Sequence, residues 1–221
     1  AGGAMQETAF GKGDTYEAFG NYIDAMSVPS LGYYGYDDYP FKFWCGYPLE
    51  PEFIRTMQFV VGRIKGKGLP FHFTIQSYAA NTVDDKGNER KLGEADLNWQ
   101  ANLALSFGAK KLYYYTYWRF QTRSALVKPD VAIMDDDGTK ILYDEAKNNN
   151  ALIKKIFKFI GDYEYCRSEL LGRDDDNAAL KGVVSDNLGI ISDYSAESPI
   201  LVNEMSNGEK KIYCLFNCRD P

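Results

Sequence analysis

Long helical segments separate the extended segments of this chain, and that spacing limits the folds it can adopt. Apolar residues recur every three or four positions in the helical segments, and short runs rich in Tyr, Phe and Ile lie between them. Connections longer than about a dozen residues allow neighbouring strands to pair in parallel. The pattern predicts a parallel α/β sheet or barrel. Its elements are a helix over 15–26, a strand over 31–37, a helix over 51–64, a strand over 69–77, a helix over 94–107 and a strand over 111–118.

Local signals mark the ends of these helices. Asp14 is suited to be an N-cap, and Pro51 is suited to the first helical position because a proline lacks the N–H that would be unpaired there. Gly66, Gly68 and Gly108 follow the apolar stripes in positions typical of helix C-termini.

The second half of the chain has a different pattern. We predict a hairpin over 131–144 that turns at Asp136–Gly138, and then one long helix from Tyr143 to Leu171. The polar segment 172–177 marks a boundary. Beyond it the apolar period changes to two, which predicts short antiparallel strands over 182–195 and over 199–217, the latter turning at Asn207–Gly208.

Composition excludes several classes of function. The chain has 221 residues, a net charge of −6 and no basic tract, so nucleic acid is a poor partner. It contains 17 Tyr, 13 Phe and 3 Trp but only 1 His, and its four cysteines are scattered. We therefore predict no metal and no cofactor. A Cys214–Cys218 disulfide and free buried thiols both remain open.

No run approaches the roughly 18 apolar residues that a membrane span needs, so no membrane association is predicted and a soluble protein is expected. The first residues lack the basic start and apolar core of an intact signal peptide. A start at Ala1 indicates a processed, tagged or cut chain. The cysteines leave the compartment open, secretion and the periplasm included.

Four segments together resemble a known family. They are YYGYDDYPF (33–41), PFHFTIQS (70–77), DLNWQANLALSFGAKKLYYYTYW (96–118) and LYDEAKNNNALIKKI (142–156). Their order is similar to the second half of a (β/α)8-barrel glycoside hydrolase of the β-galactosidase-like kind. The block GAKKLYYYTYW is the most specific part, and the tail over 199–217 resembles the start of the accessory β-domain in that family.

The resemblance implies a fold and a domain division. Residues 1–172 would be the C-terminal part of a TIM-barrel glycosidase domain, with the last three strands and helices of the barrel. Residues 178–221 would begin a C-terminal β-sandwich-like domain. A barrel removes sheet edges only when it is closed, so the missing barrel half, or a second chain that supplies it, is an expected partner. An oligosaccharide or glycoside is the expected substrate.

Barrel sites lie at the C-terminal ends of the strands. The predicted substrate-binding residues are therefore Asp37, Tyr39, Gln76, Tyr117 and Trp118, because aromatic faces stack on sugar rings while carboxylates and amides bind hydroxyls. Trp118 is either a stacking platform or a cap on the barrel core. Asp37 is a weak catalytic candidate, and it fits the cap of a nearby loop equally well. The adjoining Asp38 and Trp44 either line the cleft or pack the loop.

Catalysis by this chain alone is in doubt. Hydrolysis needs two carboxyl groups, and the family places its acid/base on the fourth strand, which is absent, and its nucleophile on the seventh. Here the nucleophile position is Ile75, or Gln76 if the alignment slips by one residue. Glu94 lies in a predicted first helical turn, where capping is its better role. His72 is better explained as a core histidine than as a general base.

Two functions thus compete. In the first, the chain belongs to a carbohydrate-active hydrolase and supplies substrate-binding residues. In the second, it is a non-catalytic carbohydrate-binding protein or pseudoenzyme that lacks the nucleophile. Fold-level likeness to hydrolases without any sugar binding is a third reading.

Overall fold

The computed structural model describes residues 15–41, 49–78, 91–118, 132–135, 137–172, 177–195 and 197–221. Its elements are α2 Thr15–Met26, η1 Pro29–Leu31, β1 Tyr34–Asp37, α3 Phe53–Ile64, β2 Phe71–Gln76, α4 Glu94–Ser106, β3 Lys111–Tyr115, α5 Tyr143–Ile160, β4 Glu164–Leu171, η3 Ala178–Leu180, β5 Ile200–Ser206 and β6 Lys211–Asn217. In the described residues no helix is long and apolar enough to cross a membrane.

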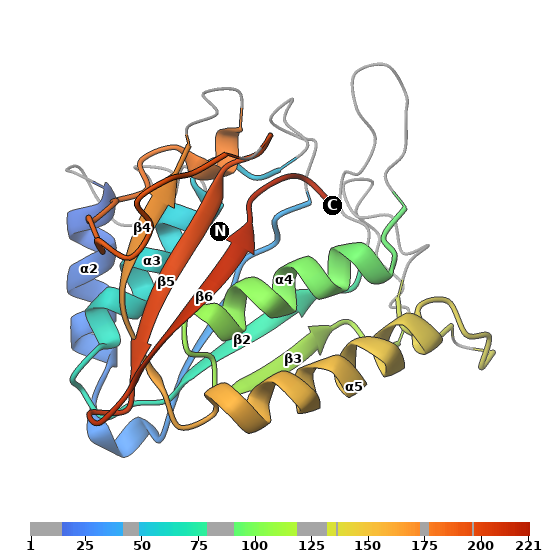
Figure 1. Ribbon diagram of the computed structural model, residues 1–221. Coiled ribbons are helices and arrows are strands. Elements are labelled where there is room, and N and C mark those ends of the chain that lie inside the picture. The colour runs from blue at the N-terminus through green and yellow to red at the C-terminus, as the bar shows by residue number, and fades with distance from the viewer. Residues whose placement is uncertain are drawn as a thin grey trace.

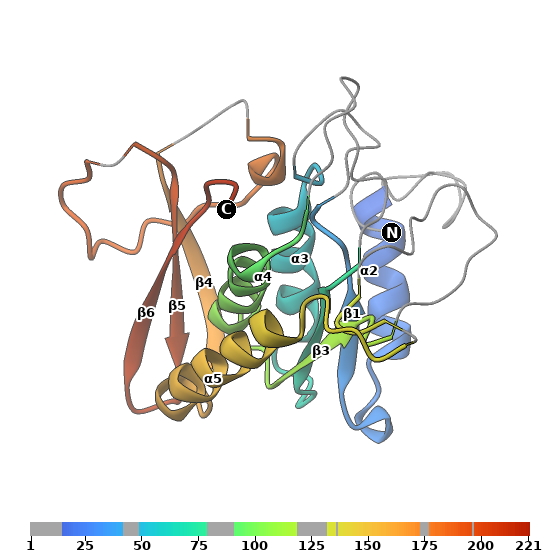
Figure 2. The same cartoon turned by 90° about the vertical axis from the view of Figure 1, so that its right-hand side faces the viewer.

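The chain forms a mixed α/β structure with two three-stranded sheets. The first sheet is parallel in the order β1-β2-β3, and the second is antiparallel in the order β4-β5-β6. Helices α3 and α4 lie between the two sheets, and α2 packs beside α3 (Figure 1; Figure 2). The predicted order of alternating helices and parallel strands is therefore confirmed.

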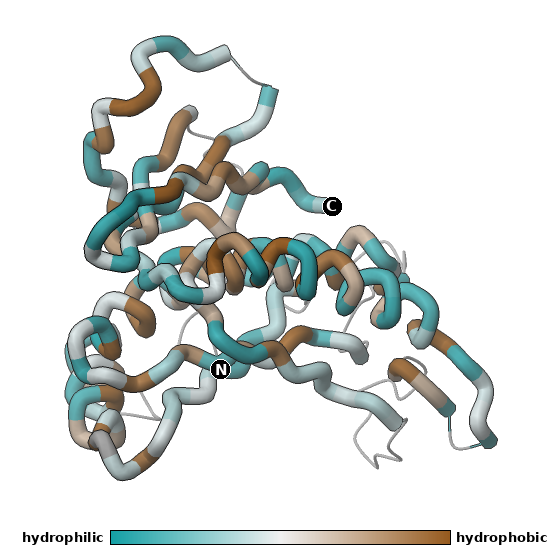
Figure 3. The backbone as a smooth tube through the Cα atoms, turned by 60° about the horizontal axis from the view of Figure 1, so that its bottom comes forward, coloured by the Kyte–Doolittle hydropathy of each residue, from teal (hydrophilic) through white to brown (hydrophobic). Residues whose placement is uncertain are grey.

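One tryptophan joins the layers. The ring of Trp99 on α4 contacts Phe53 of α3 at a centroid distance of 5.9 Å and Phe216 of β6 at 5.2 Å. Its Nε1 donates a hydrogen bond to the carbonyl of Arg219 across 3.0 Å. Phe53 in turn meets Phe73 of β2. These buried rings belong to one hydrophobic core, which connects the parallel sheet, the helices and the antiparallel sheet. Apolar (brown) and polar (teal) stretches succeed one another along the helices (Figure 3), as expected for helices with one buried face.

The structure corrects the predicted start of α3. This helix begins at Phe53 rather than at Pro51, because Glu52 has a left-handed backbone with φ of 61°. Glu52 is held there by its N–H, which donates to Ala178 O at 2.9 Å, and by its carboxylate, which accepts from the Tyr16 hydroxyl at 3.0 Å. The ends at Gly66, Gly68 and Gly108 are confirmed, since all three glycines have positive φ. Asp14 lies outside the described residues.

The long helix predicted from Tyr143 to Leu171 is wrong in its second half. Helix α5 ends at Ile160, and residues 164–171 form β4, which pairs with β5. The Lys110 ammonium donates to the carbonyls of Gly161 and Tyr163 at 2.9 and 2.6 Å and so stabilises the end of the helix from a distant part of the chain. The antiparallel sheet thus begins before the polar segment 172–177.

The strands predicted over 182–195 are also wrong, because this segment has no regular structure in its described residues. The hairpin predicted over 199–217 is confirmed as β5 and β6. In the described residues between 132 and 142, isolated bridges form in place of a paired hairpin, Met134 to Lys140 among them, and Gly138 N donates to Asp135 O in a turn. Cys166, Cys214 and Cys218 are free thiols, so the alternative of a Cys214–Cys218 disulfide is not the one observed.

Candidate functional site

The C-terminal ends of the three parallel strands meet at one edge of the first sheet. The register pairs Asp37 with Thr74 and Thr74 with Tyr113, and two residues further along it pairs Gln76 with Tyr115. Residues paired across a parallel sheet point to the same face. The strand order therefore brings these positions together.

Three tyrosines form a cluster at this edge. The rings of Tyr39 and Tyr78 lie edge to face at 5.0 Å, and those of Tyr78 and Tyr115 at 5.3 Å. Tyr39 and Tyr115 are 6.0 Å apart. Tyr115 is 44% exposed, so the cluster borders solvent while its rings support one another.

Asp37 carries an exposed carboxylate beside this cluster. The Tyr39 hydroxyl donates to Asp37 Oδ2 across 3.1 Å. Burial raises the pKa of Tyr39 far above its usual value, and the neighbouring Asp37 carboxylate raises this pKa further. Tyr39 therefore stays a hydrogen-bond donor over the physiological range. The two residues that were predicted at this strand end therefore lie in hydrogen-bond contact.

Asp38 is buried and holds the loop that follows β1. It is fully buried, and its carboxylate accepts from the Tyr36 hydroxyl at 3.1 Å and from the Tyr39 N–H at 2.9 Å. Of the two roles open for it, packing of the loop is the one its contacts support. Trp44 lies outside the described residues.

Gln76 is fully buried as well. Its Oε1 accepts from the N–H of Phe41 at 3.0 Å, and its Nε2 donates to the carbonyls of Phe41 and Tyr78, each at 3.1 Å. These bonds fix the segments that follow β1 and β2. The Gln76 side chain thus holds the main chain at the strand ends and does not line their solvent-facing surface.

Tyr117 and Trp118 follow the end of β3, which is Tyr115 rather than the predicted Trp118. Their rings lie edge to face at 5.2 Å, and Trp118 is 51% exposed. The Tyr117 hydroxyl donates to the sulfur of Met134 at 3.3 Å, and Trp118 bridges to the same residue. The exposed ring of Trp118 is compatible with a stacking platform, and it does not test the alternative of a cap on a barrel core, because the described strands form an open sheet.

The face of the sheet away from the helices is also aromatic. His72 stacks on Tyr33 at 4.3 Å and meets the Tyr113 hydroxyl at 3.4 Å through Nδ1. Burial lowers the pKa of His72, and the charge of Lys111 lowers it further. His72 lies among rings near the start of β2, on the face of the sheet away from the helices. It is only partly buried, so the predicted position in the core is not the one observed.

The carboxylates of the described residues do not include one at the end of β2. Ile75 is fully buried, and Gln76 carries an amide. Glu94 lies in the first turn of α4 and accepts a hydrogen bond from the Asn148 side chain at 3.3 Å, whereas the carboxylate that caps this helix is that of Asp96, which accepts from Gly93 N at 2.8 Å. The described chain holds no group of three His, Cys, Asp or Glu side chains arranged to bind a metal.

Sequence reasoning missed Tyr78 and Tyr115. Period-two alternation from Tyr113 onward already placed Tyr115 on the same face as Tyr113, so this signal was available. Tyr78 joins the cluster only through the order of the strands, which a single sequence does not reveal.

A scan against protein-family models and a search of the curated proteins found no match for this sequence.

Proposed function

We propose that this chain is a carbohydrate-active, glycoside hydrolase-like protein that binds sugar rings at the C-terminal ends of β1, β2 and β3. The observation that carries the proposal is the exposed surface at that edge, where Asp37 lies beside the tyrosine cluster Tyr39–Tyr78–Tyr115, with Tyr117 and Trp118 on the neighbouring strand end. Flat aromatic rings next to a solvent-exposed carboxylate suit a ligand with apolar faces and many hydroxyls.

The arrangement of the parallel sheet supports the barrel part of the proposal. Helices cover one face, while the other face exposes Tyr33, Tyr113 and Tyr115 in the described residues. Parallel sheets are normally buried on both faces. Further strands that close a (β/α)8 barrel would cover this aromatic face, and another part of a longer protein or a second chain would supply them.

The described carboxylates favour a binding role over complete catalysis. Hydrolysis needs two carboxyl groups, about 5–5.5 Å apart for retention or 6.5–9.5 Å for inversion. Among the described residues, Asp37 is the exposed carboxylate at the strand ends, and the position at the end of β2 where the resembled family carries its nucleophile is occupied by Ile75 or Gln76. The chain would thus contribute substrate-binding residues to a cleft that is completed elsewhere.

A second candidate is a non-catalytic carbohydrate-binding protein. The hydrogen bonds of Gln76 favour it, because they use the side chain to hold Phe41 and Tyr78 and leave no carboxylate at that strand end. Both candidates share the sugar-binding surface and differ only in turnover.

The test is incubation of the purified chain with aryl glycosides and natural oligosaccharides, with binding followed by calorimetry and hydrolysis by product release. We expect binding without hydrolysis. Turnover by the 221-residue chain alone would contradict the assignment of essential carboxylates to another polypeptide segment. Turnover only after the missing half is supplied would favour the hydrolase over the non-catalytic candidate.

A further inference from the structure

The aromatic residues at the strand ends fall into two separate groups. Tyr115 belongs to the tyrosine cluster beside Asp37. Tyr117 and Trp118 form an aromatic pair, with ring centroids 5.2 Å apart. In the part of the chain that the structure describes, no ring of this pair contacts a ring of the tyrosine cluster. Tyr117 is 44% exposed and Trp118 51%, so the aromatic pair offers a surface of its own to solvent.

The spacing of the two groups suits a ligand longer than one sugar ring. Aromatic rings in contact have centroids about 4.5–7 Å apart, and the rings of the two groups are not in contact, so a single sugar stacked on Trp118 lies beside Tyr115 rather than on it. An extended chain advances at most about 3.3–3.6 Å per residue, so the Cα atoms of Tyr115 and Trp118 are at most about 11 Å apart. Neighbouring residues of one short oligosaccharide can therefore contact both groups.

The end of β2 holds the main chain that joins the two groups. Ser77 N donates to Tyr115 O at 2.8 Å, and Ser77 Oγ donates to Thr116 O at 3.2 Å. Ser77 is itself fully buried. The Thr116 hydroxyl then donates to Trp118 O at 3.1 Å. The start of the joining segment is thus fixed to the parallel sheet.

A later segment of the chain holds the same main chain from the other side. Ile133 N donates to Thr116 O at 3.2 Å, and Met134 N donates to Tyr117 O at 2.8 Å. Every carbonyl over residues 115–118 therefore accepts a hydrogen bond. The separation of the aromatic pair from the tyrosine cluster is set by these bonds before any ligand arrives.

The side chain of Met134 supports the aromatic pair directly. The Tyr117 hydroxyl donates to Met134 Sδ at 3.3 Å, and Met134 forms a parallel bridge with Trp118. Met134 is partly buried and packs against the hydrophobic core, whereas both rings are exposed. A thioether is polarisable and adapts its shape to neighbouring groups. Met134 therefore connects two exposed rings to the core of the protein.

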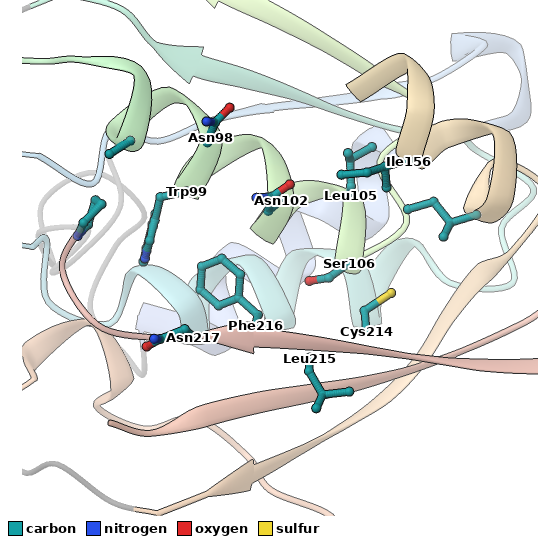
Figure 4. A pocket seen from close by; sticks show the side chains of 13 residues that line it. Asn98, Trp99, Asn102, Leu105, Ser106, Ile156, Cys214, Leu215, Phe216 and Asn217 are labelled. Atoms are coloured by element: carbon teal, nitrogen blue, oxygen red, sulfur yellow. The ribbon is translucent and has the colours of Figure 1, made fainter. Parts of the chain in front are cut away.

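A groove elsewhere on the molecule does not extend this surface. It lies between α4, α5 and β6, has a volume of about 550 Å³ and is lined mainly by apolar side chains such as Leu105, Ile156 and Phe216 (Figure 4). No residue of the tyrosine cluster or of the aromatic pair lines it. A ligand that extends beyond the tyrosine cluster along the end of β3 meets the aromatic pair instead.

We propose that Tyr117 and Trp118 form a second sugar subsite next to the subsite of Asp37 and the tyrosine cluster, and that the ligand is an oligosaccharide that occupies both. Met134 is the positioning residue of the second subsite. This inference rests on the proposed function and names its ligand more closely. Rings that are already held in place lose little conformational freedom on binding, so the second sugar residue adds affinity.

The test is a calorimetric titration with two series of oligosaccharides, one of β-linked galactose and one of β-linked glucose, each from the monosaccharide to the pentasaccharide. In the series that binds, we expect the affinity to rise by about tenfold from the monosaccharide to the longer members and then to level off. Trp118→Ala should remove this rise and leave the monosaccharide within about twofold of its wild-type affinity. Asp37→Asn should instead weaken all members of the series alike.

Each failure has its own signature. Equal affinities along the series, or an equal loss for short and long members in Trp118→Ala, would overturn the second subsite and leave the proposed function standing. A single sugar held between the two groups would give this equal loss. Absence of binding by every sugar would overturn both the proposed function and the second subsite.

The role of Met134 is tested with a disruptive and a conservative variant. Met134→Ala should weaken the longer sugars by about fivefold, leave the monosaccharide unchanged and alter the near-UV circular dichroism of Trp118, identified by its loss in Trp118→Ala. Met134→Leu restores most of the apolar contact and should stay within about threefold of the wild type. Met26→Ala on α2, where the side chain is 45% exposed, is the control and should change neither readout.

A second variant tests the same contact if Met134→Ala does not fold. Tyr117→Phe removes the hydroxyl that bonds to Met134 and lies on an exposed ring, so the fold is retained. It should weaken the longer sugars by about threefold, and Met134→Leu should add little to this loss, because both changes remove one bond. Wild-type binding and circular dichroism in Met134→Ala, or fully additive losses in the double variant, would overturn the positioning role.

Discussion

The side chain of Gln100 holds both main-chain polar groups of Gln76. Gln100 Oε1 accepts from Gln76 N at 2.7 Å, and Gln100 Nε2 donates to Gln76 O at 3.1 Å. Gln76 in turn holds the main chain of Phe41. One buried chain of amides thus connects α4 to the end of β2 and to the segment that follows β1. The fixed position of Asp37 and Tyr39 depends on this connection.

Gln100→Leu should therefore destabilise the protein by about 2–4 kcal/mol. The leucine leaves two buried main-chain groups of Gln76 without partners, and each such group costs about 1–3 kcal/mol. Urea unfolding followed by fluorescence measures the change. Asn102→Leu on the same helix, which faces the groove near β6, is the control and should change stability by about 0.5 kcal/mol or less. Equal losses in the two variants would contradict the role of Gln100.

The carboxylate of Glu204 should make the stability of the protein depend on pH in the acid range. This carboxylate on β5 is buried, and it accepts from Arg167 at 3.3 Å, Lys211 at 3.1 Å and Tyr213 at 3.3 Å. Burial alone would raise its pKa, but the bonds from Arg167 and Lys211 outweigh burial and lower the pKa of Glu204. Because its folded pKa lies below its unfolded pKa, the carboxylate contributes stability above about pH 4.3, and this contribution is lost as the pH falls through the folded value.

Replacement of Glu204 tests whether this carboxylate causes the loss of stability in acid. Glu204→Gln should cost about 1.5–3 kcal/mol at pH 7, since hydrogen bonds to charged groups are lost. It should also flatten the fall in stability between about pH 5 and pH 3, as measured by urea unfolding at each pH. Glu209→Gln at the exposed hairpin turn should keep the wild-type profile. A steeper acid transition in Glu204→Gln than in the wild type would contradict the prediction.

We expect the protein to lose stability at alkaline pH, because two tyrosine hydroxyls and one cysteine thiol have raised pKa values. Burial raises the pKa of Tyr34, Tyr114 and Cys218 to about 12 each. The unfolded chain loses these protons from about pH 8.5 for the thiol and about pH 10 for the phenols, while the folded chain keeps them. Stability should therefore fall as the pH rises above about 9. Denaturant titrations combined with tyrosinate absorbance measure this slope, and Tyr34→Phe should reduce it. A constant stability between about pH 9 and pH 11 would exclude the effect.

The sequence anticipated the first half of the fold better than the second. Helix α2 and the hairpin of β5 and β6 have strong local periods and turn residues, so their positions could be predicted. In β4 a bulge between Tyr165 and Arg167 breaks the period of two, and this local signal is close to that of the preceding helix. Lys110 ends α5 from about fifty residues away, which no local pattern reports.

The residues of the candidate site could be predicted where a polar or aromatic side chain directly follows a strand. Asp37 lies at the predicted end of β1 with Tyr39 two residues beyond it, and both side chains lie at or near solvent, whereas Trp118 lies three residues beyond the end of β3. The burial of Gln76 was not predictable, because it depends on Phe41 and Gln100, which approach from other elements. Residue type alone does not distinguish an amide that binds a ligand from one that holds a loop.

The most direct test of the central claim is a calorimetric titration of the wild-type protein and of Trp118→Ala with methyl β-galactoside and a panel of oligosaccharides. Trp118 is half exposed, so its replacement should leave stability nearly unchanged. Phe159→Ala removes an even more exposed ring far along α5 and serves as the control. We predict that the wild type and Phe159→Ala bind a sugar of the panel and that Trp118→Ala binds it at least about tenfold more weakly. Absence of sugar binding by the wild type, or equal binding by Trp118→Ala, would contradict the account.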